Sequence, residues 1–439
     1  MAGGTWTTQN KVRPGVYINF EGEGKPAGTA GDRGIMTMAL PLGWGEAKKV
    51  LTINAGDDVK TMLGYDITAP QLLLVREALK RAKTVLLYRL NAGTKAEAKV
   101  GALTVTAKHG GVRGNDLSVV VQANIDDSKK FDVKTLLAGQ VLDIQTVVDI
   151  NELKANDWVE FYGKGDSSPT TAGASLTSGA DGTVTNQDHT DYLAAIEVFD
   201  FQTMALASGD ATLKSVYTAF VKRLRDTEGK KVQAVLENYP AADFEGIISV
   251  KNGVVLTDGT VLDAVKATVW VAAATAGAQV NQSLTYQAYD DAVDADIRYT
   301  NSQIESALRG GEVVFVQNKG RAIVEQDLNT FKSFLPTKGK AFSKNRVIRA
   351  LDGIANDIKR IFETFYIGKV NNDHDGRNLL WNEVVTYLRT LQANAAIQNF
   401  NSQTDVKVIQ GQDVDSVYVE LHIQPVDSIE KIYMKVTVK

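Results

Sequence analysis

Two clusters of polar residues are the places where this sequence could support chemistry. The first has four aspartates within seven residues, Asp290, Asp291, Asp294 and Asp296. Such carboxylates could bind a metal ion or act as an acid–base pair. No histidine or second glutamate is tied to them by spacing, so a solvated acidic face is the simpler interpretation.

The second cluster runs from Asn371 to Gly376 and matches the first half of a calcium-binding loop. The bidentate Glu of such a loop would be residue 382, which is Asn382. We therefore favour a connection between two helices, in which Asn, Asp and Gly serve as turn and cap residues. A metal-dependent hydrolase that uses either cluster remains the alternative hypothesis.

Other catalytic signatures are missing from the sequence. Cysteine is absent, which excludes disulfides, thiolate metal sites and Cys nucleophiles. The four histidines form no H-x-x-x-H or H-E-x-x-H motif, and neither a P-loop nor a G-x-S-x-G motif occurs. We therefore expect no enzymatic activity, no catalytic, cofactor-binding or metal-binding residues, and no cofactor.

A basic segment lies in the last third of the chain. Residues 338–349 contain five Lys or Arg residues and no Asp or Glu. On a helix that begins near Asn345, the side chains of Arg346, Arg349 and Arg360 would fall within an arc of about 60°, opposite an apolar stripe. This pattern indicates either a positive patch that faces an acidic partner or an ordinary solvated face. The six candidates are Lys338, Lys340, Lys344, Arg346, Arg349 and Arg360.

Composition narrows the class of protein. The chain has 439 residues, 44% of them apolar and 23% charged, which is typical of a folded protein of about three domains. It has 48 Lys and Arg against 52 Asp and Glu, which argues against direct nucleic-acid binding. No apolar run reaches the ~18 residues of a membrane helix, and the start lacks the features of a secretory signal. We expect a protein made in the cytoplasm that does not insert into membranes.

The elements that position these residues follow from hydrophobic periodicity. Residues 35–42 and 84–90 have strand patterns on either side of a helical pattern at 72–82, which indicates an α/β unit. Many short Val-, Thr- and Ile-rich runs between 100 and 159 indicate a small β-sandwich inserted into that unit. Helices and strands alternate again after 188, with a hairpin turn at Asp258-Gly259, so we expect a largely parallel sheet covered on both faces.

Both ends of the chain have strand patterns. Val16, Ile18 and Phe20 alternate near the start, and another alternation continues to the last residue. Chain termini usually fray unless something pairs with them, so both ends are candidates for strand addition to another chain. The predicted strand-arm residues are Val16, Tyr17, Ile18, Phe20, Ile432, Met434, Val436 and Val438.

These patterns together predict a multidomain α/β protein. A central α/β sheet domain carries an inserted all-β, sandwich-like domain, and it is followed by an α+β C-terminal domain. Extended β-strand arms lie at both termini. The predicted boundaries are an arm at 1–30, an α/β segment at 31–92, the β-sandwich at 93–176, the α/β core at 177–335, the C-terminal domain at 336–425 and a strand arm at 426–439.

Several short motifs resemble one known family. Pro14-Gly-Val-Tyr-Ile-Asn-Phe-Glu21 resembles the opening of contractile phage tail sheath proteins, and Ala276-Gly-Ala-Gln-Val-Asn-Gln-Ser-Leu-Thr-Tyr286 resembles their middle region. So do Asp296-Ile-Arg-Tyr-Thr300 and Gly310-Gly-Glu-Val-Val-Phe315, while Gly368-Lys-Val-Asn-Asn-Asp-His-Asp-Gly-Arg377 resembles their C-terminal domain. The match looks closest to sheaths of myophages and of phage-tail-like particles from Gram-positive bacteria.

The resemblance implies a structural function. Sheath proteins polymerise into a helical homo-oligomer around an inner tail tube and contract from a metastable state to drive the tube through a cell envelope. Exchanged terminal strands link the subunits, and the C-terminal domain lies innermost. The implied partners are other copies of the chain, the tube protein, and baseplate and tail terminator proteins. The particle would be a virion or a phage-tail-like particle assembled in the bacterial cytoplasm.

Under this resemblance the six basic residues become candidates for inner-tube contact. A non-contractile, self-assembling shell protein is a further alternative, and it would form flat sheets instead of tubes.

Overall fold

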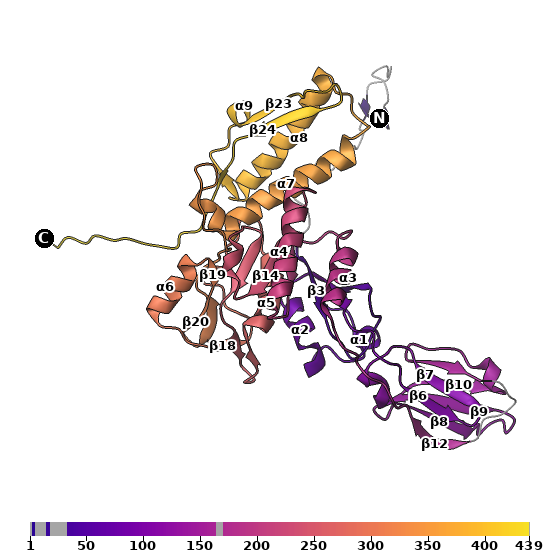
Figure 1. Cartoon of the computed structure of the whole chain (residues 1–439). Coiled ribbons are helices and arrows are strands. Elements are labelled where there is room, and N and C mark those ends of the chain that lie inside the picture. Colours follow the sequence, from indigo (N-terminus) through magenta and orange to yellow (C-terminus); the bar gives the residue numbers. More distant parts are fainter. Residues whose placement is uncertain (1, 5–14, 18–32, 164–169, 439) are drawn as a thin grey trace. The chain divides into compact units, whose positions relative to one another are not determined.

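A computed structural model describes residues 2–4, 15–17, 33–163 and 170–438 of the chain (Figure 1). The described residues form two compact units. Unit 1 holds residues 357–393 and 399–423 and the described part of the N-terminal arm. Unit 2 holds residues 33–356, 394–398 and 424–438, apart from the gap at 164–169.

The centre of unit 2 is a seven-stranded sheet with strand order β19-β15-β14-β13-β3-β5-β4. All neighbours pair in parallel except β4, which is antiparallel to β5. Its interior strands are buried on both faces, as parallel sheets require, so the predicted sheet type is confirmed. Its strands are β3 (Ile35–Leu40), β4 (Val50–Asn54), β5 (Thr84–Arg89), β13 (Thr203–Ala205), β14 (Gln233–Glu237), β15 (Ile247–Val250) and β19 (Glu312–Val313).

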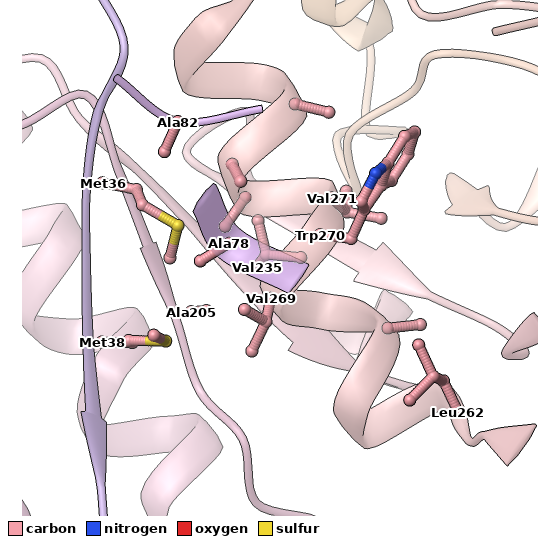
Figure 2. Close-up of a cluster of buried hydrophobic side chains, with 14 of the residues drawn as sticks. Met36, Met38, Ala78, Ala82, Ala205, Val235, Leu262, Val269, Trp270 and Val271 are labelled. Carbon is pink, nitrogen blue, oxygen red and sulfur yellow. The ribbon is translucent and has the colours of Figure 1, made fainter. Parts of the chain in front are cut away.

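Helices cover both faces of this sheet. On one face, α5 (Ala264–Gly277) packs against the strands and against α2 (Leu73–Leu79). On the other face, α3 (Asn186–Ile196) and α4 (Ala211–Asp226) bury their aromatic and aliphatic side chains. Figure 2 shows the first of these cores, with side chains from the strands, α5 and the region of α2, among them Met36, Met38, Ala78, Ala205, Val235 and Val269.

An inserted β-sandwich lies between β5 and α3. Its two sheets have the strand orders β10-β9-β8-β12 and β11-β7-β6, and buried residues alternate along β7, β8 and β9. This alternation puts one face of each sheet into a shared core, so the predicted sandwich is confirmed. The strands are β6 (Glu97–Val100), β7 (Leu103–Ala107), β8 (Leu117–Ala123), β9 (Phe131–Leu137), β10 (Gln140–Val147), β11 (Val159–Tyr162) and β12 (Thr171–Ser175).

Smaller elements complete unit 2. The predicted hairpin at Asp258-Gly259 joins β16 to β17, and Gly259 adopts the positive φ of 84° that such a turn needs. Strand β18 pairs with β16, β20 pairs with β21, and β22 pairs with β25. The bounds are α1 (Lys60–Leu63), β16 (Val254–Leu256), β17 (Val261–Leu262), β18 (Ala292–Ala295), α6 (Asn301–Arg309), β20 (Phe315–Asn318), β21 (Arg321–Val324), β22 (Ile397–Gln398) and β25 (Gln424–Pro425).

Unit 1 is an α+β arrangement. Helix α7 (Asn345–Phe365) begins in unit 2 and ends in unit 1, where α8 (His374–Ala393) and α9 (Ser402–Asp405) follow. Strands β23 (Val406–Gln410) and β24 (Val417–Leu421) pair antiparallel, and β23 packs on α8. The helix expected to begin near Asn345 is therefore present as α7.

The N-terminal arm contains one short strand pair. Strand β1 (Ala2–Gly4) pairs in parallel with β2 (Gly15–Tyr17). The predicted strand residues Val16 and Tyr17 lie in β2 and thus have a partner within the same arm. Ile18 and Phe20 lie outside the described residues.

The C-terminal arm differs from its sequence pattern. Residues 426–438 were expected to form a strand, but they have no regular secondary structure. In Figure 1 this segment is the thin yellow line that ends at the label C. An extended segment becomes a β-strand only when a neighbour completes its backbone hydrogen bonds, and residues 431–438 have no paired strand among the described residues.

Candidate assembly interface

The C-terminal arm exposes apolar side chains. Ile432 is 79% exposed and Tyr433 is 91% exposed, and Met434, Val436 and Val438 are exposed to similar degrees. Apolar and polar residues alternate along this segment, as they do in a half-buried strand. An unpaired, apolar, extended segment is a template for pairing with another chain. The arm therefore has the chemistry of an assembly element.

Unit 1 contains a strand ribbon that could accept such an element. The β23–β24 pair stands alone as a two-stranded sheet, with α8 packed on β23. Two-stranded ribbons are marginal by themselves, and an added strand would stabilise one. Tyr418 on β24 is 52% exposed, and Ile409 on β23 is also exposed. These side chains offer apolar surface to an added strand.

The six basic candidates do not form one cationic face. Arg349 was expected to point outward, but it is only 2% exposed. Its guanidinium donates to the Gln282 carbonyl at 2.5 Å and lies 3.5 Å from an Asp327 carboxylate oxygen. Arg346 is half-buried, with an Nη2 atom 3.4 Å from the Ala395 carbonyl. Backbone carbonyls of Gln282 and Ala395 in unit 2 thus engage the two arginines in the first half of the helix.

The three lysines differ in their surroundings. Lys338 pairs with Glu245 at 2.6 Å, and its ammonium lies 5.0 Å from the centre of the Phe331 ring. Lys344 is largely buried and pairs with Glu430. Lys340 is exposed. Lys338 and Lys344 therefore form ion pairs within unit 2.

Arg360 is the candidate that unit 1 holds. It lies in the last half of α7, its side chain is 44% exposed, and its Nη2 is 3.6 Å from Asp357. Such a partly exposed pair contributes little to stability, roughly 0–1 kcal/mol, and can be given up for another partner. Arg360 thus has the partly exposed side chain that is expected of a contact residue.

The four aspartates have structural partners. Asp290 accepts hydrogen bonds from Arg81 at 2.6 and 2.7 Å and from the Trp270 indole at 2.9 Å. Asp294 pairs with Arg298, and Asp291 lies 3.4 Å from the Lys80 ammonium. Asp296 accepts from the Gly253 N–H at 2.7 Å, and burial raises the pKa of its carboxyl.

Asp290 and Asp296 therefore hold neighbouring segments in place, whereas Asp291 and Asp294 form partly exposed ion pairs. In the described part of the chain, no three His, Asp or Glu side chains are placed together to hold a metal ion.

The Asn371–Gly376 segment caps a helix. The Asp373 carboxylate accepts the Gly376 N–H at 2.8 Å at the start of α8. Asn372 donates to the carbonyls of Val414 and Ser416, both at 2.8 Å. These bonds fasten the loop to the β23–β24 turn. The cap interpretation favoured from the sequence agrees with this geometry.

Three features of the fold indicate the class of protein. Unit 2 is a layered α/β body with an inserted sandwich, unit 1 offers a strand ribbon, and the C-terminus ends in an unpaired apolar segment. This combination is that of a multidomain structural protein with an exposed apolar segment.

Family models place the chain in one family. They match the phage tail sheath protein Gp18 domain III N-terminal region at residues 33–90, the sheath β-sandwich domain at 91–181, the sheath central domain at 182–330 and the sheath C-terminal domain at 337–439. The chain belongs to the phage tail sheath protein family, which is a family of structural proteins. It is thus a component of a virion or a phage-tail-like particle.

Individual relatives agree. The crystal structure of a sheath tail protein from Desulfitobacterium hafniense is 61% identical, with a TM-score of 0.87, and the match covers 97% of this chain and 100% of that chain. The phage-like element PBSX protein XkdK of Bacillus subtilis (strain 168) is 39% identical over all of both chains.

The helical sheath of the anti-feeding prophage, in its contracted state, shares the fold at 13% identity, with a TM-score of 0.56 over 97% of this chain and 99% of that one. In the described residues of this chain, no helix is long and apolar enough to cross a membrane.

Proposed function

We propose that this chain is the subunit of a contractile sheath. Many copies form a helical tube around an inner tail tube, and the tube shortens from a metastable extended state to drive the inner tube through a cell envelope. Family membership and the fold shared with a contracted sheath support this proposal. The energy comes from subunit contacts made on contraction, as in other two-state assemblies.

In this proposal the arms connect the subunits. The single observation that carries it is the exposed apolar C-terminal segment, which has no strand partner within the described residues of its own chain. A sister subunit completes it by adding it to a ribbon such as β23–β24. Four to six backbone hydrogen bonds at about 0.5–1.5 kcal/mol each would contribute roughly 2–9 kcal/mol per junction. That is enough to keep subunits tethered while their bodies rotate.

The decisive experiment is deletion of residues 432–439. We expect the variant to unfold at the same temperature as the full chain, because the deleted side chains described here are exposed. We also expect it to form no linked tubes in electron micrographs. Tubes as stable in dilution and salt as those of the full chain would contradict the proposed strand exchange.

The inner-tube contact is proposed for unit 1. The innermost position of the C-terminal domain in related sheaths, as the resemblance implies, favours Arg360 and its neighbour Lys359 as contact residues. Baseplate and terminator proteins are the proposed partners at the two ends of the tube. A metal-dependent hydrolase has no observation in its favour, because the carboxylates that suggested it are engaged in structural bonds.

A further inference from the structure

We propose that Glu430 anchors the root of the C-terminal arm to the body of its own subunit and so sets the point from which the arm is free. This inference rests on the proposed role of the arm as a donated strand. It assigns a positioning role to Glu430 and its partner Lys344, which no family resemblance or comparison assigned.

The anchor is built from three separate segments of unit 2. The Glu430 carboxylate accepts a hydrogen bond from the Thr285 hydroxyl at 2.9 Å, one from the Gln326 amide and one from the Lys344 ammonium. Only 11% of the Glu430 side chain is exposed, and only 14% of the Lys344 side chain. Charge-assisted bonds of this kind are among the strongest side-chain contacts.

The electrostatic environment favours the charged form of Glu430. Burial alone would raise the pKa of its carboxyl, but the hydrogen bonds and charge of Lys344 together with Gln326 outweigh burial and lower it. Glu430 is therefore ionised at neutral pH, and its charge is compensated where it is buried.

The receiving side is held together by hydrogen bonds that do not involve the arm. The Thr285 hydroxyl accepts the Asp327 N–H at 3.0 Å, and the buried Asp327 carboxylate accepts from the Leu284 N–H and the Asn345 amide, both at 3.0 Å. These bonds join the 284–285 loop, the segment after β21 and the start of α7. A preformed site loses less entropy when it binds a chain segment.

Side-chain exposure along the arm shows where the arm leaves the body of the subunit. From residue 429 to residue 438, Glu430 is the one residue that is not exposed. It lines a groove of about 830 Å³ that Lys332, Lys340 and Phe334 also line. The next bond to the body in the N-terminal direction is the Val426 N–H to the Ala396 carbonyl, at 3.0 Å. Loss of the anchor would therefore release the chain from about residue 427 onward.

The position of the anchor determines the reach of the arm. Nine residues follow Glu430, which span at most about 30 Å when extended. Release back to residue 427 would lengthen the free segment by four residues, or about 13 Å. A longer, looser tether lowers the effective concentration of the strand at a fixed acceptor. The anchor thus favours delivery to one neighbouring subunit at a defined distance.

Limited trypsin digestion of the unassembled full chain tests the anchor directly. Lys431 and Lys435 are both cleavage sites, and only Lys431 adjoins the anchor. Lys344→Ala removes the ammonium partner without changing the sequence of the arm. We expect cleavage after Lys431, relative to cleavage after Lys435, to rise about tenfold. Mass spectrometry of the released peptides measures this ratio.

Two variants serve as controls. Lys344→Arg should restore protection, because a guanidinium can also donate to Glu430. Lys332 also lines the groove, but it is exposed and does not contact Glu430. Lys332→Ala should therefore leave the cleavage ratio unchanged. Equal ratios in Lys344→Ala and Lys332→Ala would overturn the anchor. Thermal unfolding of each variant excludes a general loss of structure.

Assembly provides a second and separate readout. Lys344→Ala should raise the protein concentration needed for tube formation about tenfold, whereas deletion of residues 432–439 should abolish tubes altogether. If the deletion has no effect, strand donation fails, while the proteolysis result still decides whether the anchor exists. If cleavage after Lys431 rises but tubes form at the normal concentration, the anchor exists, and its role in delivering the strand is refuted.

Discussion

His109 shows how burial of one residue couples stability to pH. Its ring lies edge-to-face against the Trp44 ring, with centroids 5.2 Å apart. Burial, together with the positive charges of Lys108 and Arg89, lowers the pKa of His109 to about 4. In the unfolded chain the pKa returns to about 6.5, so the unfolded chain binds more protons between these values. The free energy of unfolding contributed by this site is thus fully present above about pH 6.5 and decreases as the pH falls toward 4.

The substitution His109→Gln should flatten that dependence. The wild-type chain should lose up to about 3 kcal/mol relative to the variant between pH 6.5 and pH 4, with partial solvent screening reducing this upper bound. Urea unfolding of both proteins across this range measures the difference. His422→Gln, which alters an exposed histidine directly after β24, should follow the wild type. Parallel curves for His109→Gln and the wild type would contradict the assignment.

Among the elements, α7 contributes different surfaces to the two units. In unit 2 its first half is fixed by charge, since Asp352 accepts two hydrogen bonds from Arg225 at 2.6 and 2.8 Å. In unit 1 its second half is fixed by the Asp357 carboxylate, which accepts from the Tyr387 hydroxyl at 2.8 Å. Lys359 and Arg360 follow Asp357, and both side chains are partly exposed and form ion pairs on the same helix.

Reversal of charge at that end of α7 tests the proposed tube contact. The double variant Lys359→Glu and Arg360→Glu should bind the inner-tube protein about tenfold more weakly in co-sedimentation, because attraction to acidic groups becomes repulsion. Sheath tubes should still form, and the unfolding temperature should change little, because both side chains are exposed. Lys369→Glu, in the following loop, is the matched control. Equal weakening in the control, or loss of sheath tubes, would contradict a specific contact.

Helix α5 illustrates a limit of sequence patterns. Its residues from Ala267 to Ala276 are buried on all sides between the sheet and α2, so the helix has no polar face and no helical period. Periodicity therefore gives no signal for this helix. By contrast, α4 and α7 each have one apolar face, and the helix predicted to begin near Asn345 is α7.

At the scale of the whole chain, the β-sandwich is joined to the sheet domain by two adjacent connecting segments that hydrogen-bond to each other. The two ends of the insert lie side by side, since the Asn91 amide donates to the Asp181 carbonyl at 2.5 Å and the Thr94 N–H donates to the Ala180 carbonyl at 2.7 Å. The buried Arg89 guanidinium binds nearby backbone carbonyls, and Trp44 of the sheet domain lies in the sandwich core. The insert thus leaves and rejoins the sheet domain at adjacent points, and we expect it to be separable from that domain.

Excision of residues 92–181 tests this organisation. In the variant, two glycines join Asn91 to Gly182, and Trp44→Ser replaces the indole that excision would expose. We expect this variant to keep a cooperative unfolding transition. The two cores on the faces of the seven-stranded sheet contain no residue of the insert, so they should persist. Circular dichroism and calorimetry measure the outcome. A molten or aggregated product would show that the sheet domain depends on the sandwich for folding.

The sequence alone determined most of the local structure and the class of protein. Amphipathic helices and half-buried strands produce periodic sequence patterns, because side-chain direction repeats every 3.6 residues in a helix and every 2 in a strand. The order of these patterns along the chain indicates the order of the domains. The sandwich and the parallel sheet could be predicted on this basis, and short motifs indicated the sheath family, whereas the strand predicted at the C-terminal arm is not formed.

Only the tertiary structure decided which side chains meet. It buried Arg349 beside Asp327 and paired Lys344 with Glu430, although the sequence pattern had suggested that both basic side chains face outward. It also showed that the C-terminal alternation is an extended segment and not a strand within its own chain. The physical reason is the same in each case: ion pairs, burial and strand pairing join residues far apart in sequence, and a local pattern carries no information about the distant partner.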